Sequence, residues 1–298
     1  MRSTEPPSNN DRLIQRYLDF LRLERRYSEH SVLAVRRDLS FIEGSLATVS
    51  ASALKTILVK RHAGGSAPSS LARMASSWRG FFGFLLDAGQ IEVNPALGLK
   101  TPKLPRALPK AVGVDQLAAL LQGPLPEQYR LAQAHVLIEL LYCTGLRISE
   151  ALSLSNAVLA NSTELRVQGK GNKTRIVPVI NALRERFAEF SDLRTKHLTQ
   201  LGKPPASALF VSAKGLPLSA RQAQKDVSEF SKLRGLDQHL HPHMLRHSFG
   251  SHMLQSTQNL RAVQELLGHA SIASTQVYTA LDFDHLSGVY DKAFPRAK

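Results

Sequence analysis

The chain has 298 residues, 43% of them hydrophobic, a single cysteine and a formal net charge of +14, with basic residues in excess in both halves. The length allows one large or two ordinary domains, the lone Cys143 excludes an intrachain disulfide, and short apolar runs without a signal core favour a cytoplasmic protein over a membrane-spanning one. The positive charge favours a polyanionic partner, such as nucleic acid or an anionic membrane surface, with a generally basic soluble protein as the alternative.

Residues 1–99 are predicted to form a small helical bundle. Apolar side chains recur there at helical spacing in four segments, which are residues 13–21, 28–42, 52–64 and 71–89. Six arginines are expected on the polar faces of these helices, where the group as a whole would suit contact with phosphate. They are Arg25, Arg26, Arg36, Arg37, Arg73 and Arg79.

Residues 100–111 are predicted to be an interdomain linker because prolines and cations alternate along them. Residues 112–298 are predicted to form a mixed α/β domain, which makes the whole chain mainly α with a small β-sheet. Helices are expected at residues 114–121, 129–143, 147–152, 181–198, 219–233, 242–255 and 260–267, followed by a segment that holds Tyr278. Two strands are expected at residues 164–168 and 174–179, joined by a hairpin turn at residues 169–172.

Short motifs in the second domain carry the groups needed to cut a phosphodiester without a metal. Negative charge builds on the non-bridging oxygens in the transition state, and the guanidiniums of Arg147 and Arg246 are suited to bind them. Glu150, three residues after Arg147, is placed to hold that guanidinium on a helix face. Lys170, on a glycine-flanked hairpin tip, is placed to protonate a leaving oxygen. Tyr278 supplies a hydroxyl nucleophile, which needs help to ionise because its reference pKa is about 10.

The remaining candidates are histidines. His243 shares a predicted helix face with Arg246, and His269 begins a turn after a predicted helix. A zinc site at His241, His243 and His247 is the weaker alternative, because no carboxylate or cysteine lies near them in the sequence. Taken alone, each motif is more typical of an ordinary surface ion pair, a solvated turn or a core residue than of a catalytic site. Their order and spacing together form a much more specific signal.

The ordered set resembles the tyrosine recombinase family, also called the phage-integrase-like family. The family pattern is complete here: Arg147, Lys170, His243, Arg246, His269 and Tyr278. The resemblance extends over nearly the whole chain. The stretch 263–298 is most similar to the Xer branch, the bacterial chromosome-dimer recombinases.

The resemblance implies how the scissile phosphate is held. Arg147 and Arg246 would clamp it, and His269 would donate a hydrogen bond to one of its oxygens. Glu150 would orient the arginines without touching the DNA. No metal and no cofactor are expected.

The resemblance also implies the chemical steps. Tyr278 would attack the phosphate and form a 3′-phosphotyrosyl link, which keeps the bond energy so that rejoining needs no ATP. His243 would assist proton transfer from Tyr278, and Lys170 would protonate the departing 5′ oxygen.

On the scale of the whole molecule, the resemblance implies a helical core-binding domain and a catalytic domain that close as a C-shaped clamp on double-stranded DNA. It implies strand exchange through a Holliday junction at dif-like sites, which resolves chromosome and plasmid dimers during segregation. A XerD-like partner in a heterotetramer and a DNA translocase of the FtsK type are the implied protein partners. A C-terminal helix over residues 284–293 would dock on a neighbouring subunit, or else pack on its own domain.

Two other interpretations compete with the Xer-type recombinase. A phage, integron or transposon integrase would use the same site, although the compact length without an added arm-binding domain favours the Xer type. A non-catalytic DNA-binding protein would use the same basic charge and helical clamp. Pure binding needs neither His269 nor Tyr278, which favours the enzyme.

Overall fold

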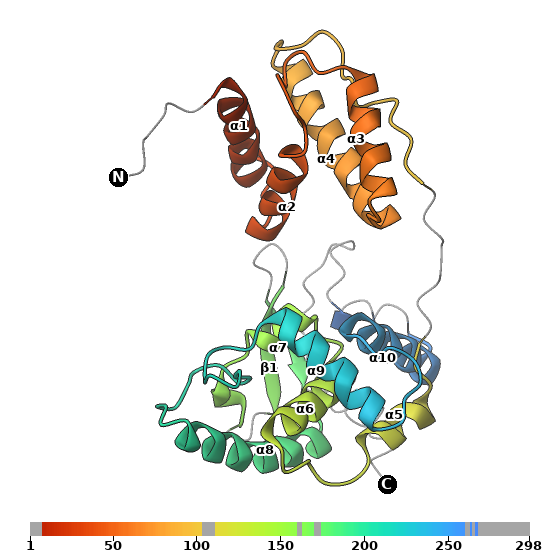
Figure 1. Ribbon diagram of the computed structural model, residues 1–298. Coiled ribbons are helices and arrows are strands. Elements are labelled where there is room, and N and C mark those ends of the chain that lie inside the picture. Colours follow the sequence, from red (N-terminus) through yellow and green to blue (C-terminus); the bar gives the residue numbers. More distant parts are fainter. Residues whose placement is uncertain are drawn as a thin grey trace. The chain divides into compact units, whose positions relative to one another are not determined.

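The computed structural model describes residues 8–102, 111–159, 163–169 and 174–259, together with residues 263, 266 and 267. The chain divides into two compact units, Met1–Ala107 and Leu108–Lys298. The described residues are mainly helical with one two-stranded sheet, so the predicted fold class is confirmed (Figure 1). Among them, no helix is both long and apolar enough to cross a bilayer. The linker at residues 100–111 stays a prediction, since only residues 100–102 and 111 of it are described.

Unit 1 consists, in its described residues, of the four predicted helices. They are α1 (Asn9–Leu23), α2 (Glu29–Leu39), α3 (Ala51–Ala63) and α4 (Pro68–Asp87). The side chains of Ser8, Ser28 and Ser50 cap the first three by accepting a backbone N–H of the first turn. The apolar faces of the helices meet around Trp78 and Phe81, which are fully buried.

A buried carboxylate links α2 to α4. Asp38 is fully buried and accepts a hydrogen bond from Arg73, while its carbonyl accepts one from Nε1 of Trp78 at 2.8 Å. Arg79 donates to the carbonyl of Leu99 at 2.7 Å. Arg73 and Arg79 are therefore bonded within unit 1, because its inward-facing acceptors need donors. Arg73 and Arg79 are partly exposed and the other four arginines are exposed, which agrees with the predicted polar faces, although Arg73 and Arg79 also bond within unit 1.

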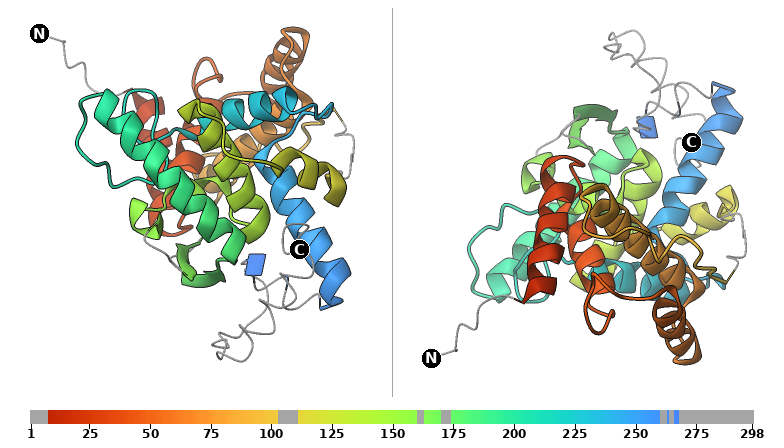
Figure 2. Two further views of the ribbon diagram at one scale, coloured as in Figure 1. Left: turned by 90° about the horizontal axis from the view of Figure 1, so that it is seen from below. Right: turned by 90° about the horizontal axis from the view of Figure 1, so that it is seen from above.

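Unit 2 is built around a central helix, α6 (Tyr129–Thr144), which is buried along its length from Ala132 onward. It packs against α8, α9 and α10, and Figure 2 shows α8 and α10 on opposite sides of it. A helix that is buried on all faces belongs at the centre of a domain. The other helices are α5 (Val114–Leu121), α7 (Ile148–Leu152), η1 (Asn156–Leu159), α8 (Asn181–Gln200), α9 (Ala220–Leu233) and α10 (Pro242–Thr257).

The sheet of unit 2 has the two predicted strands. They are β1 (Glu164–Gln168) and β2 (Thr174–Pro178), which pair antiparallel. Val167 lies opposite Arg175, and Leu165 lies opposite Val177. The apolar members of these pairs are buried, so this face of the hairpin packs on the core and Arg175 shares it. Residues 170–172 of the predicted turn and most of the predicted helix 260–267 lie outside the described residues.

Gly145 ends α6 in a left-handed conformation, with φ of +62°. A Cβ atom at this position would lie 2.6 Å from Cε1 of Phe249. Gly202, after the end of α8, has nearly the same φ of +60° but no atom within 4 Å of such a Cβ. The two glycines therefore share a backbone requirement and differ in steric surroundings.

Gly145→Ala should lower the free energy of unfolding of unit 2 by roughly 3 kcal/mol, since it adds overpacking to the cost of a left-handed alanine. Gly202→Ala, the matched control, should cost about 1 kcal/mol from the backbone conformation alone. Urea unfolding followed by circular dichroism measures both. Equal losses would show that contact with Phe249 does not constrain the end of α6.

Candidate active site

The turn after α6 places the first two predicted site residues. Arg147 is the N-cap of α7, and the Glu150 carboxylate accepts from the Arg147 backbone N at 2.7 Å and from its Nη1 at 3.0 Å. The predicted pair is thus present. However, α7 begins at Ile148, one residue later than predicted, so Glu150 caps the helix instead of meeting Arg147 along a helix face.

A second arginine, not singled out from the sequence, holds the same carboxylate. Nη1 and Nη2 of Arg175 donate to Oε1 and Oε2 of Glu150 at 2.9 and 2.8 Å. Its Nε donates to the carbonyl of Leu266 at 3.0 Å. The sequence signal for this residue is its place in β2, two positions before the buried Val177, where a cation faces the core and needs an acceptor.

Arg246, on α10, reaches the turn that follows α6. Its Nη1 donates to the carbonyl of Gly145 and its Nη2 to the carbonyl of Leu267. Burial and, to a lesser extent, the neighbouring charge of Arg147 together lower the pKa of Arg246 to about 10, while Glu150 opposes the shift. The two predicted phosphate-binding arginines therefore lie close enough to repel each other.

The cluster of Arg147, Arg175, Arg246 and Glu150 carries a local excess of positive charge. Glu150 is 6% exposed and is the carboxylate that both Arg147 and Arg175 contact. One carboxylate balances one of three guanidiniums, which leaves a charge of about +2. The Arg147 side chain is 37% exposed, against 14% for Arg175, so Arg147 is the more accessible to an anion. This arrangement is suited to binding a phosphate.

The charge state of Glu150 follows from its surroundings. Burial raises its pKa, but hydrogen bonds from Arg175 and from the backbone and side chain of Arg147 outweigh burial and lower the pKa to about 2. The carboxylate is therefore ionised at neutral pH and accepts all of these hydrogen bonds.

The histidines before and within α10 differ in their contacts. His243 is exposed and lies one helical turn before Arg246, on the same helix. His241 caps α10, with Nδ1 accepting from the backbone N of Met244 at 3.3 Å. Within the described ranges, no group of three or more His, Cys, Asp or Glu side chains is placed to hold a metal ion. Lys170, His269 and Tyr278 lie outside the described residues.

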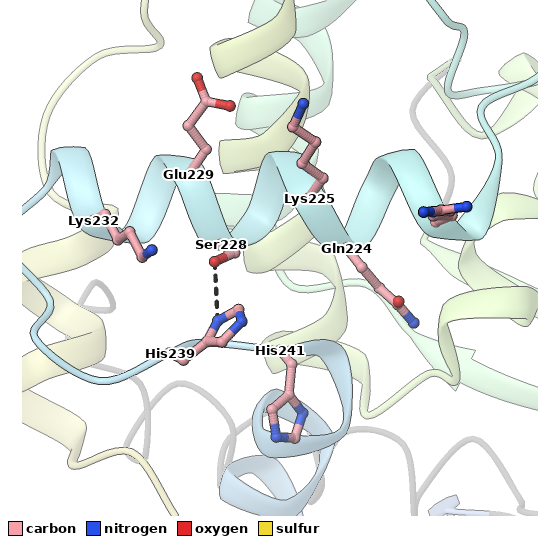
Figure 3. A pocket seen from close by; sticks show the side chains of 8 residues that line it. Gln224, Lys225, Ser228, Glu229, Lys232, His239 and His241 are labelled. Carbon is pink, nitrogen blue, oxygen red and sulfur yellow. Dashed lines mark hydrogen bonds between the residues drawn. The ribbon is translucent and has the colours of Figure 1, made fainter. Parts of the chain in front are cut away.

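A basic hollow lies beside the start of α10, between α9 and the chain leading to His241 (Figure 3). We call it the α9 groove; its volume is about 530 Å³. Arg221, Lys225 and Lys232 line it with exposed side chains. The lining carboxylate of Glu229 already accepts hydrogen bonds from Arg130. The groove therefore presents unbalanced positive charge.

The sequence matches the Phage integrase family over residues 111–285 and its N-terminal SAM-like domain over residues 14–89. It is 43% identical to the tyrosine recombinase XerC of Azotobacter vinelandii over 291 residues, which cover 95% of each chain. It is 44% identical to XerC of Chromobacterium violaceum over 299 residues, covering 97% of this chain and 96% of the relative. The chain belongs to the tyrosine recombinase family.

The fold of this tyrosine recombinase agrees with that assignment. It is similar to the crystal structure of XerH site-specific recombinase bound to difH substrate, with a TM-score of 0.58 and 20% identity over 96% of this chain and 86% of the other. The family resemblance stated from the sequence is confirmed, including its similarity to the Xer branch. Members of the family cut and rejoin DNA, so the predicted enzyme class is confirmed as well.

Glu150→Gln should lower the free energy of unfolding of unit 2 by about 3 kcal/mol near neutral pH. Because the folded-state pKa of Glu150 is about 2, below its ordinary value of 4.5, its contribution is complete above pH 4.5 and is lost as the pH falls towards 2. The difference between wild type and variant should shrink over that window.

Urea unfolding at several pH values, followed by circular dichroism, measures this difference. Trp78 is the single tryptophan and lies in unit 1. The urea transition that its fluorescence reports should therefore be the same in wild type and variant. Glu164→Gln is the matched control, because Glu164 forms a loose, exposed pair with Arg166 at 3.6 Å. A loss that is the same at every pH would contradict the assignment of an ionised, stabilising Glu150.

Proposed function

We propose that this recombinase cuts and rejoins double-stranded DNA at a dif-like site and resolves chromosome and plasmid dimers. The identity of 43–44% with curated XerC proteins over nearly the full chain supports the Xer type. The similar fold of XerH, which was solved with its difH substrate, supports a dif-like duplex as the DNA. The bacterial chromosome lies in the cytoplasm, and we place the enzyme there too.

The observation that carries the proposal is the meeting of Arg147 and Arg246. They come from segments about a hundred residues apart, yet Arg246 donates to the carbonyl of Gly145, two residues before Arg147, and Arg147 contacts the ionised Glu150 carboxylate. In our proposal these two guanidiniums bind the non-bridging oxygens of the scissile phosphate. They stabilise the charge that builds there during attack, in a partly buried site where such donors act strongly.

The proposed reaction is a transesterification at phosphorus. The Tyr278 oxygen attacks, the bond to the 5′ oxygen breaks, and a 3′-phosphotyrosyl ester forms. His243 takes part in removing the phenolic proton, Lys170 gives a proton to the 5′ oxygen, and His269 donates to a phosphate oxygen. Attack by a 5′ hydroxyl on the ester reverses these steps, so that rejoining consumes no ATP.

The α9 groove is proposed to contact the DNA near the cut. Its cations, Arg221, Lys225 and Lys232, lie on the helix that packs against the chain entering α10, where His243 and Arg246 reside. Such side chains bind the phosphate backbone and make affinity depend on salt.

Protein partners are also part of the proposal. A second, XerD-like recombinase would complete a heterotetramer that exchanges strands through a Holliday junction, and a DNA translocase of the FtsK type would activate it. The predicted C-terminal helix at residues 284–293 would dock on the neighbouring subunit. These assignments rest on the likeness to XerC.

Tyr278→Phe should abolish the covalent protein–DNA adduct while leaving DNA binding within about three-fold of wild type, since the phenol is lost but the phosphate-binding cations remain. The adduct is trapped on a nicked duplex that carries a dif-like site, and the modified residue is mapped by mass spectrometry. Binding is followed by gel shift at constant salt.

Two results would contradict this proposal. An adduct formed by the phenylalanine variant would mean that another side chain is the nucleophile. A wild-type chain that binds the duplex without ever forming an adduct would favour the non-catalytic alternative.

Cleavage should persist in the presence of EDTA, because the guanidiniums supply the positive charge at the phosphate.

A further inference from the structure

We propose that Arg175 is a positioning residue of the recombination site, which fixes the Glu150 carboxylate and the Leu266 carbonyl with a single guanidinium. By holding Glu150, Arg175 fixes the position of Arg147. By holding the Leu266 carbonyl, it fixes the backbone that leads to His269. The inference rests on the proposed function and deepens it, since it adds a residue that acts without touching the DNA.

Arg175 uses its whole guanidinium for hydrogen bonds within the protein. All three of its guanidinium nitrogens donate, two to the oxygens of Glu150 and one to the carbonyl of Leu266, at 2.8–3.0 Å. The side chain is 14% exposed. A bidentate arginine–carboxylate pair fixes both partners in direction as well as distance. Arg175 is therefore suited to orient its neighbours rather than to bind phosphate.

Arg147 makes fewer side-chain contacts with the protein than Arg175 and is more exposed. It donates one side-chain nitrogen, Nη1, to Glu150 and is 37% exposed. Glu150 thus lies between an inner arginine, Arg175, and an outer one, Arg147. If the inner partner is removed, the carboxylate is free to turn towards the outer one, and the donors of Arg147 that face the phosphate move with it.

Arg175 also connects parts of the chain that hold three of the proposed catalytic residues. It lies on β2, five residues after Lys170, and it contacts α7 at Glu150, three residues after Arg147. Leu266, its third partner, precedes His269 by three residues. A displacement of about 1 Å in such a site is enough to slow the chemistry by a factor on the order of a hundred.

Lysine is not an adequate substitute at this position. Its ammonium is a single point charge on a flexible stem, so it can retain the charge but cannot span both Glu150 oxygens and the Leu266 carbonyl together. Comparing Arg175→Lys with Arg175→Gln therefore separates the charge of Arg175 from its geometry.

The test uses the full chain and a nicked duplex carrying a dif-like site, at DNA concentrations that saturate each variant. Arg175→Gln should form the covalent adduct about 100-fold more slowly than wild type, with the Kd for DNA changed less than about three-fold. Arg175→Lys should be slower by about 10-fold. Arg166→Gln, on the neighbouring strand with a side chain that is 76% exposed, is the matched control and should react at the wild-type rate under saturation.

A double variant shows whether Arg175 acts through Glu150. If it does, Glu150→Gln combined with Arg175→Gln should slow the reaction by much less than the product of the two single losses. If the loss in rate of the double variant instead equals the product of the two single losses, Arg175 does not act through Glu150. Circular dichroism melting identifies variants that are unfolded, and if Arg175→Gln fails to fold, the rate of Arg175→Lys decides.

The outcomes separate this inference from the proposed function. If wild type forms no adduct, the proposed function fails. If wild type reacts and either Arg175 variant, folded and bound to DNA, reacts equally fast, the positioning role is wrong while the recombinase assignment stands. A loss of rate that is seen below saturation and disappears at saturating DNA would also overturn the positioning role, because it would reflect affinity alone.

Discussion

The carboxylate of Glu150 is the acceptor on which the described part of the candidate active site depends. It caps α7 through the backbone of Arg147, holds the Arg147 side chain and pairs with Arg175. One negative charge is enough to keep the arginines together in the free chain but too little to neutralise them. The same ion cluster therefore contributes to folding and leaves positive charge for a phosphate.

The scaffold of unit 2 gives this cluster its place. The central helix α6 ends at Gly145, where Phe249 of α10 packs so closely that a side chain would not fit. The carbonyl of Gly145 accepts from Arg246, which extends from α10 towards the turn that bears Arg147. Close packing and a hydrogen bond at one turn thus join two segments that are distant in the sequence.

Much of the fold could be predicted because it is encoded locally. Apolar periodicity located α4 and α6, and alternating residues around a glycine-rich turn located β1 and β2. The features that were missed depend on contacts between distant segments. Arg73 is bonded to Asp38 of another helix, and Arg175 finds its acceptors on α7 and at Leu266, which no local pattern specifies. The family pattern of the site residues was evident in the sequence, whereas the ion cluster behind Arg147 required the structure.

We propose that Arg147 and Arg246 stabilise the negative charge on the scissile phosphate. Strand cleavage of two otherwise identical duplexes tests it most directly, one with the natural phosphate and one with an uncharged methylphosphonate at the cut. Arg147→Ala and Arg246→Ala should slow cleavage of the natural duplex by about 100-fold or more, and that of the methylphosphonate duplex by less than about 10-fold. Equal losses on both duplexes would mean that the two guanidiniums do not act on the charge of the phosphate.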